Sequence, residues 1–325
     1  MSQLEASWYG KKRWFTYLLL PLSGLFYLIA TLRRGVYQLG IMKPATKTLP
    51  VIVIGNISVG GNGKTPFALW LAEYLSQQGK KVAIVSRGYG SKAPYYPYSV
   101  TEAHPAEVVG DEPKLLQSRL GCPLVISPDR NAALALISRD FDVDVVLSDD
   151  GLQHYAMARD VELCIVDSQR QFGNRLLMPA GPLREPVSRT KSVDLVIENG
   201  GHAPLSYQLQ QDGFYRVLDN TLVTDINKAH AVSAIGNPQR FIDSLAAVGV
   251  EVLSQQHFRD HHQFCFDDFV SCGADAVVMT EKDAVKCRAF AKANWYYLRV
   301  SAQPSDELRT ALNNILINKG ILHGI

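Results

Sequence analysis

Residues 51–65 read Val-Ile-Val-Ile-Gly-Asn-Ile-Ser-Val-Gly-Gly-Asn-Gly-Lys-Thr, and this stretch decides the fold. Its first four residues form a short apolar run, which is typical of a strand buried on both faces. After the glycines, apolar residues recur at helical spacing from Thr65 to Gln78, and Gly79 ends the pattern. A strand, a glycine-rich loop ending in Lys-Thr and a helix, in that order, predict a P-loop that binds a nucleotide.

The loop has the chemistry that phosphate groups require. Its glycines let backbone N–H groups turn toward phosphate oxygens, and the helix N-terminus adds a favourable dipole. We expect Lys64 to reach the β- and γ-phosphates and the Thr65 hydroxyl to ligate Mg²⁺. The strict motif has glycine where this chain has Ser58, so the motif is a variant. The predicted nucleotide-binding residues are Ser58, Val59, Gly60, Gly61, Asn62, Gly63, Lys64 and Thr65.

Further strands and helices alternate along the chain. Apolar runs at 82–85, 124–126, 143–147 and 163–166 are separated by helical patterns, which predicts a parallel, doubly wound α/β sheet. A Gly/Pro-rich stretch at 173–186 indicates a crossover, and a second, weaker α/β alternation follows it. We therefore predict an N-terminal anchor region at 1–42, a P-loop core at 43–172 and a smaller C-terminal α/β lobe at 173–325 that closes the cleft.

Acidic residues follow two of these patterns. Asp149 and Asp150 end the strand predicted at 143–147, as in a Walker B element whose Asp holds Mg²⁺ directly or through water. Asp111 and Glu112 begin a predicted helix. They either stabilise the helix N-terminus or supply a magnesium ligand and a base for an attacking hydroxyl.

Two other motifs carry reactive side chains. Phe258-Arg259-Asp260-His261-His262 places two histidines beside an acid in a polar loop, where a histidine can tune or relay a proton for a carboxylate base. A structural role for these histidines is equally compatible with the sequence. The rigid turn around Arg184, within Gly181 to Pro186, presents an arginine to a phosphate or is simply a linker.

Composition sets the limits of the functional reading. The chain has 325 residues, 47% apolar and 20% charged, with a formal net charge of +2. Such a composition is typical of a globular protein, and the lack of a long basic block argues against nucleic acid as a partner. The five cysteines form no C-x-x-C pair, which indicates reduced thiols rather than a disulfide framework or a zinc site.

The N-terminus is unusually apolar. Residues 15–32 carry no charge, and they are flanked by Lys11, Lys12 and Arg13 on one side and by Arg33 and Arg34 on the other. The stretch is just long enough to span a bilayer. A span would place the first basic cluster outside, against the positive-inside tendency, whereas basic residues at both ends suit a helix lying on an anionic surface. We favour such a monotopic anchor over a span, and a helix buried in the globular body is the third reading.

Taken together, the motifs resemble those of the tetraacyldisaccharide 4′-kinases of lipid A synthesis. The similarity runs in family order from the N-terminal anchor to near residue 286. The motifs that carry it are residues 55–66 around the P-loop, Ser86-Arg87-Gly88-Tyr89-Gly90, Gly110-Asp111-Glu112-Pro113, Asp149-Asp150-Gly151-Leu152-Gln153-His154, residues 179–185, Asp260-His261 and residues 280–286. Asn62 stands where the family is expected to have threonine.

The resemblance implies an enzyme at the cytoplasmic face of the inner membrane. It would use ATP and Mg²⁺ to phosphorylate the 4′-hydroxyl of a tetraacylated glucosamine disaccharide 1-phosphate, forming lipid IVA. By this analogy Asp111 is the base and His261 its partner, with Lys64 as the third catalytic residue. The same analogy gives the roles of the remaining candidates: Thr65, Glu112, Asp149 and Asp150 for the metal, and Arg87, Gln153 and Arg184 for the acceptor.

Two other classes of protein remain as alternatives. A membrane-associated ATPase switch of the deviant Walker type also uses Gly-Gly-x-Gly-Lys-Thr, but it has a signature lysine where this chain has Val59. A non-catalytic nucleotide sensor would have no need of Asp111, Asp149 or His261.

Overall fold

The computed structural model describes residues 3–10, 13–46 and 48–323, and one mixed sheet runs through this part of the chain. The order of its neighbouring strands is β11-β10-β12-β13-β8-β7-β6-β1-β5-β2-β4-β3, with β9 paired to β8. The strands of the N-terminal half are β1 (Val51–Gly55), β2 (Val82–Ser86), β3 (Tyr98–Val100), β4 (Leu124–Ile126), β5 (Val145–Asp149), β6 (Val161–Asp167) and β7 (Leu195–Asn199). Those that follow are β8 (Ser206–Arg216), β9 (Leu222–Val223), β10 (Lys228–Ser233), β11 (Glu251–His257), β12 (Val277–Thr280) and β13 (Trp295–Pro304).

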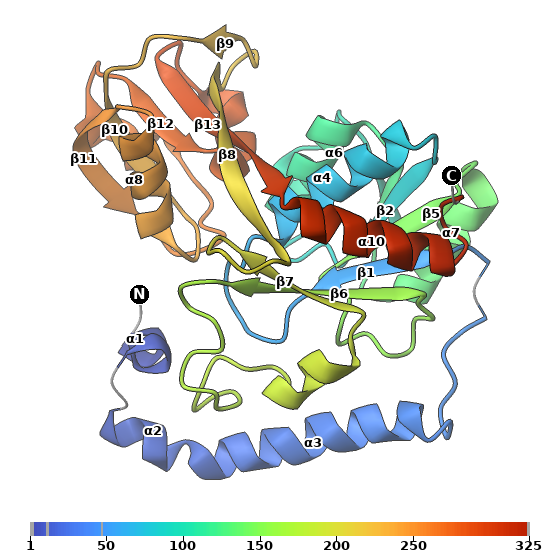
Figure 1. Ribbon diagram of the computed structural model, residues 1–325. Helices are drawn as coiled ribbons and strands as arrows, with labels where there is room; N and C mark the ends of the chain where they lie inside the picture. Colours follow the sequence, from blue (N-terminus) through green and yellow to red (C-terminus); the bar gives the residue numbers. More distant parts are fainter. Residues whose placement is uncertain (1–2, 11–12, 47, 324–325) are drawn as a thin grey trace.

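Most of the helices flank this sheet, whereas those of the N-terminal segment lie apart from it (Figure 1). The helices are α1 (Gln3–Tyr9), α2 (Trp14–Leu18), α3 (Leu20–Gln38), α4 (Lys64–Gln77), α5 (Ala106–Val109), α6 (Asp111–Leu120), α7 (Arg130–Asp140), α8 (Pro238–Ala247), α9 (Glu281–Cys287) and α10 (Asp306–Asn318). Short 3₁₀ helices occupy Val187–Ser192 (η1), Phe266–Cys272 (η2) and Arg288–Phe290 (η3). The predicted α/β class and its parallel P-loop sheet are confirmed.

β1 is the centre of the larger core. It pairs in parallel with β5 and β6, and all five of its residues are buried. Because successive side chains of a strand point to opposite faces, Ile52 and Ile54 pack with α4 and α10, whereas Val51 and Val53 pack on the other side with α7. This double burial explains why the strand reads as an unbroken apolar run.

The C-terminal lobe has cores of its own, on either side of β10, β12 and β13. β10 pairs in parallel with β11 and β12, and β13 pairs with the long antiparallel strand β8. Sequence patterns did not predict β8, because Gln208, Gln210 and Gln211 interrupt its apolar residues. The predicted domain boundary at 172/173 stays a prediction; β7, beyond it, pairs with β6 of the core, and α10 packs against that core.

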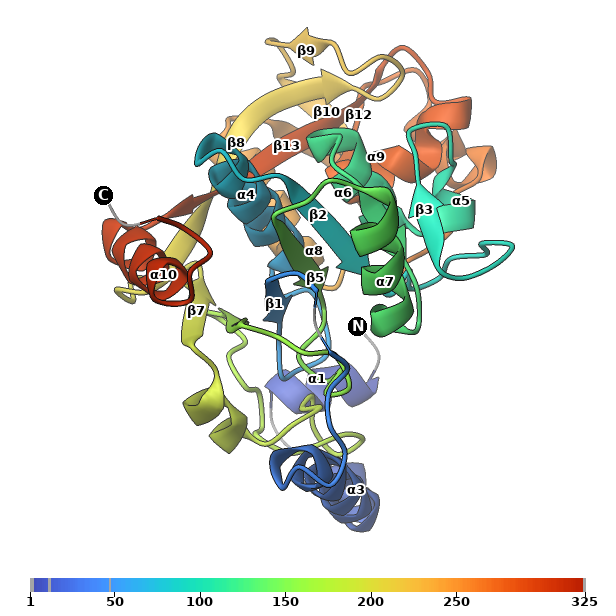
Figure 2. The same ribbon diagram turned by 90° about the vertical axis from the view of Figure 1, so that its right-hand side faces the viewer.

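The apolar N-terminal stretch at 15–32 is divided between two helices. α2 and α3 meet at Leu19, and Figures 1 and 2 both place α3 along one edge of the molecule, away from the sheet. Ser23 faces the protein and donates to the Leu177 carbonyl at 2.7 Å. Large apolar side chains on the outside are exposed: Trp14, Tyr17, Leu18, Leu20, Leu22, Leu25, Tyr27, Leu28, Ile29 and Leu32.

The described helices include none that is both long and apolar enough to cross a bilayer. Lys11 and Lys12, which the sequence placed at the head of the apolar segment, lie outside the described residues. The membrane anchor therefore stays a prediction at this point.

Candidate active site

The P-loop lies between β1 and α4, and its carbonyl groups are tied to the body of the protein. The Tyr207 hydroxyl donates to the Gly63 carbonyl at 2.6 Å, and the Asn199 amide donates to the Asn62 carbonyl at 3.0 Å. Gly63 has a φ of +85°, and a Cβ there would overlap both of these side chains. Because a peptide unit is planar, a carbonyl held outward turns the next N–H inward, toward the place of a phosphate.

The variant positions of the motif bond to each other. The Asn62 amide donates to the Ser58 hydroxyl at 2.8 Å, and both side chains are buried. The predicted crossover segment braces the same loop, since Val59 N donates to the Pro182 carbonyl at 2.8 Å and Arg184 N to the Ile57 carbonyl at 2.7 Å. Ser58 and Asn62 therefore stabilise the loop from within.

Lys64 and the acids of β5 meet at the mouth of the P-loop. Lys64 Nζ lies 3.4 Å from Asp150, which also pairs with Arg184 at 2.8 Å. Burial raises the pKa of Asp150, but the charges of Lys64 and Arg184 outweigh it and hold that pKa far below its usual range. Asp150 also adopts a left-handed φ of +49°, a strained conformation that is often found at functional sites.

Asp149, at the end of β5, has a raised pKa, in contrast to Asp150. Burial, followed by repulsion from Glu112 and Asp150, raises the pKa of Asp149 well above its usual range. The buried Arg130 donates to the backbone carbonyl of Asp149 at 2.9 Å rather than to its carboxylate. A divalent cation would relieve this repulsion.

Asp111 and His261 come together across the two lobes. His261 Nδ1 lies 3.0 Å from both carboxylate oxygens of Asp111, which is the first residue of α6 and is buried. Burial raises the pKa of Asp111, but the hydrogen bond with His261 and the charge of Lys282 bring it down to about 2. Burial lowers the pKa of His261, yet the Asp111 bond prevails and leaves it raised. Tyr89 packs on the imidazole with ring centroids 4.8 Å apart.

Lys282 was not among the predicted site residues, yet it is central to the geometry. Its ammonium lies 2.9 Å from Glu112, 3.4 Å from Asp260 and 3.8 Å from Asp111. These three carboxylates raise its pKa despite burial. The motif at residues 280–286 was visible in the sequence, but nothing in it indicates that this lysine points at acids some 170 residues away.

The residues predicted to contact the acceptor lie in two places. Gln153 and Arg184 lie together beside Asp150; the Gln153 amide donates to the Asn56 carbonyl at 2.9 Å and to Glu185 at 2.7 Å. Arg87 directly follows β2 and is exposed. His262 does not join the Asp111 pair, because it bonds Asp268 at 2.9 Å.

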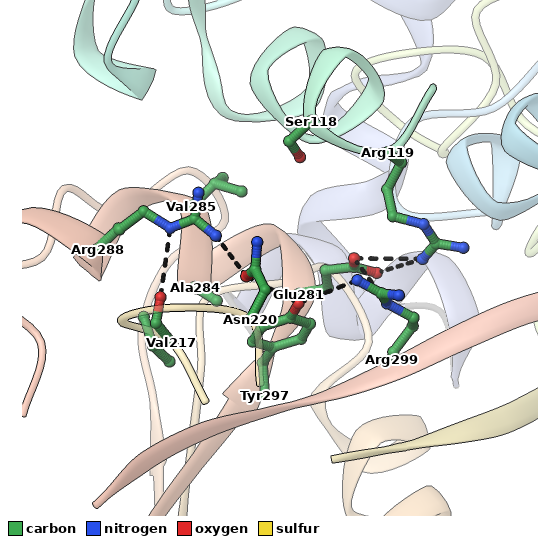
Figure 3. Close-up of a pocket in the computed structure, with 10 residues that line it drawn as sticks. All are labelled: Ser118, Arg119, Val217, Asn220, Glu281, Ala284, Val285, Arg288, Tyr297 and Arg299. Atoms are coloured by element: carbon green, nitrogen blue, oxygen red, sulfur yellow. Dashed lines mark hydrogen bonds and ion pairs between the residues drawn. The ribbon is translucent and has the colours of Figure 1, made fainter. Parts of the chain in front are cut away.

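A polar pocket lies between α6 and α9 (Figure 3). Arg119, in the last turn of α6, donates to both carboxylate oxygens of Glu281 at 3.2 and 2.9 Å, and Arg299 of β13 lies 3.5 Å from the same group. Glu281 directly precedes Lys282. The α6–α9 latch, meaning Arg119, Glu281 and Arg299, therefore holds the start of α9 where Lys282 reaches the first turn of α6.

The fold and the site define a P-loop phosphotransferase. The site combines a glycine-rich loop, a lysine and a threonine at the start of α4, acids at the end of a strand, and a carboxylate–histidine pair. These are groups that can bind phosphate and assist phosphoryl transfer to a hydroxyl. Within the described residues no group of three His, Cys, Asp or Glu side chains is arranged to hold a metal ion alone. Mg²⁺ commonly binds through one or two carboxylates, with phosphate oxygens and water completing its shell.

Comparison with known proteins gives the family. A family model described as tetraacyldisaccharide-1-P 4′-kinase matches residues 15–317, and the chain belongs to this family. It is 56% identical over 326 residues to the tetraacyldisaccharide 4′-kinase of Pseudoalteromonas translucida (strain TAC 125), with 100% of both chains covered. It is 48% identical to that of Psychromonas ingrahamii, over 94% of this chain and 97% of the relative.

A solved structure agrees with this assignment. The crystal structure of LpxK from Aquifex aeolicus in complex with ATP has a TM-score of 0.76 to this chain at 26% identity, covering 93% of this chain and 99% of that one. The resemblance seen in the motifs is confirmed.

We predict that the α6–α9 latch controls the rate through Lys282. Arg119→Met should lower kcat about tenfold and destabilise the fold by about 1–3 kcal/mol, because Glu281 loses its closest charged partner in a buried setting. Glu281→Gln should act in the same direction. The double variant should cost less than the sum of the single effects, measured by steady-state kinetics and urea unfolding. Strictly additive losses would contradict the latch.

Proposed function

We propose that this chain transfers the γ-phosphate of ATP to the 4′-hydroxyl of a tetraacylated glucosamine disaccharide 1-phosphate and so forms lipid IVA. Two relatives that it matches over 97–100% of their length are named tetraacyldisaccharide 4′-kinases, and a solved structure of similar fold, LpxK from Aquifex aeolicus, is a complex with ATP. The observation that carries the proposal is the Asp111–His261 pair, held 3.0 Å apart across the lobes. Its neighbour Glu112 is close enough to Asp149 of β5 to add to the effect of burial and raise the pKa of that carboxyl. A non-catalytic nucleotide sensor has no use for the Asp111–His261 pair.

Asp111 is the proposed base. Its carboxylate takes the proton of the attacking hydroxyl, and the His261 imidazole orients it through Nδ1. Beside a neutral imidazole the carboxylate is a stronger base than beside an imidazolium, since the positive charge lowers its proton affinity. Lys64 and Lys282 supply positive charge on the two sides of the site.

Mg²⁺ fits the residues at the mouth of the P-loop. When bound, it neutralises the charge that develops on the phosphate oxygens. Asp149 is the best-placed carboxylate, because the lysines and Arg184 already pair with Glu112 and Asp150. Thr65, in the first turn of α4, completes the proposed set, with Glu112 and Asp150 as the other candidates.

The N-terminal segment is the proposed contact with the cytoplasmic face of the inner membrane. The exposed side chains of α2 and α3 form an apolar surface, while the buried Thr16 and Ser23 face the protein. An amphipathic helix of this kind lies in the interface with its apolar side in the acyl region. This arrangement would bring a membrane-embedded lipid hydroxyl near the P-loop.

The ATPase switch of the deviant Walker type is not favoured. Its signature lysine is replaced by Val59, whose carbonyl and N–H are both engaged in bracing the loop. The family match over residues 15–317 also extends through the C-terminal lobe as far as residue 317.

A transfer assay tests the proposal. The full chain in detergent, with Mg²⁺, labelled ATP and the disaccharide lipid, should label the lipid. Asp111→Asn should lower kcat about a hundredfold and His261→Gln about tenfold, because the pair supplies base catalysis. The double variant should resemble Asp111→Asn if the two act as one unit. His262→Gln, the neighbouring histidine, is the matched control and should keep the wild-type rate. Label in free phosphate without labelled lipid would refute the proposal.

The rate should also depend on the charge of His261. The Asp111 bond raises the pKa of His261, so kcat should fall as the pH drops through that raised value and the imidazole gains a proton. The midpoint of this acid limb should lie above about 6.5, the ordinary histidine value, in a profile measured from about pH 5 to about pH 9. The limb should vanish from the residual activity of His261→Gln. A midpoint at or below the ordinary value would contradict the pairing.

A further inference from the structure

α1 reaches the P-loop from the N-terminal segment. The Tyr9 hydroxyl lies 3.3 Å from the Val59 carbonyl and donates to it. Val59 directly precedes the Gly60–Gly61 pair, and its own N–H is bonded on the opposite side, to Pro182. Because the Val59 carbonyl and the Gly60 N–H share one planar peptide, holding the carbonyl toward Tyr9 directs the Gly60 N–H the other way, into the loop.

Arg170 links the Tyr9 contact to the C-terminal lobe. Its guanidinium lies 5.1 Å from the Tyr9 ring centroid and donates to the Gly236 carbonyl at 2.7 Å. The turn at Gly236 rests directly on the P-loop, since a Cβ at this position would lie 2.9 Å from Gly61 N. Tyr9 therefore contacts Arg170, which bonds the Gly236 turn, and also donates a hydrogen bond to the P-loop itself.

α1 is held in place independently of Tyr9. The nearly buried Trp8 donates through Nε1 to the Pro179 carbonyl at 3.1 Å, and its own carbonyl accepts from Asn174 N at 2.7 Å. These bonds attach α1 to the same 173–186 segment that braces the P-loop. Removing the Tyr9 hydroxyl should therefore leave α1 docked and free only the Val59 peptide.

We propose that Tyr9 is a positioning residue for nucleotide binding. It acts through the Val59 peptide and Arg170, so that the segment carrying the apolar surface of α2 and α3 also completes the P-loop. The inference rests on the proposed function only in that the loop binds ATP. It extends that function by adding a nucleotide-site residue that lies outside the P-loop motif and some 50 residues before it.

Direct ATP binding to the full chain in detergent, measured without the lipid acceptor, tests the proposal. Tyr9→Phe keeps the ring over Arg170 and removes only the hydroxyl. The Kd for ATP should rise about three- to tenfold, the usual worth of one such hydrogen bond. In the transfer assay the KM for ATP should rise in parallel, while kcat, the KM for the lipid and the thermal midpoint stay close to the wild-type values. Tyr17→Phe, in which an exposed tyrosine of α2 is changed, is the matched control and should bind ATP normally.

A second variant tests whether Tyr9 acts together with Arg170, and the thermal midpoint separates positioning from folding. Arg170→Met should also weaken ATP binding, and its combination with Tyr9→Phe should cost less than the product of the two fold-changes because both act on one network. Unchanged ATP affinity in Tyr9→Phe, or a loss that appears only together with a lower thermal midpoint, would overturn the proposal. A wild-type chain that binds ATP but does not label the lipid would refute the proposed function without affecting the proposed role of Tyr9 in ATP binding.

Discussion

The outward anchoring of the P-loop carbonyls is the constraint on which the rest of the site depends. Asn199 holds the Asn62 carbonyl, Tyr207 holds that of Gly63, and Tyr9 holds that of Val59. Since each peptide is planar, each of these bonds turns the following N–H toward the phosphates. The cradle is thus set before a nucleotide arrives, which reduces the ordering that binding would otherwise require. Its anchors come from α1, β7 and β8, so that three distant parts of the chain must fold for one loop to work.

Opposite charges from the core and the C-terminal lobe pair with each other at the site. The core contributes the carboxylates of Asp111 and Glu112 at the start of α6, and the C-terminal lobe contributes His261 and Lys282. The α6–α9 latch, two turns further along α6, fixes the lobe at a second point. Two separated contacts define the position of α9 along α6 as well as its distance from that helix. The proposed catalytic groups from both lobes can therefore meet within hydrogen-bonding distance.

Local elements of the site could be predicted from the sequence, whereas hydrogen-bond and ion-pair partners far apart in the sequence could not. The run at 51–54 and the glycines after it predict a strand and a P-loop because burial and φ restrictions act within a few residues. Asp149 and Asp150 were likewise predictable, since they end an apolar strand. Tyr207 and Asn199 could not be predicted as site residues, because they lie 144 and 137 residues from the carbonyls that they bond. In addition, glutamines interrupt the apolar pattern of β8, which carries Tyr207. Lys282 was not predictable either, because its partners on α6 are also distant in the sequence, and the roles assigned to the predicted site residues stay predictions.

The most direct test of this account is the ATP affinity of Tyr207→Phe. The phenyl ring keeps its packing against Phe67, with centroids 5.4 Å apart in the wild type, while the bond to the Gly63 carbonyl is lost. Tyr297→Phe removes another nearly buried hydroxyl, which donates to Asn220 and accepts from Arg299 in the C-terminal lobe, and serves as the control. A preset cradle predicts that Tyr207→Phe raises the Kd for ATP about tenfold, the upper end for one hydrogen bond, and that Tyr297→Phe leaves it unchanged. Equal affinities in both variants would contradict it.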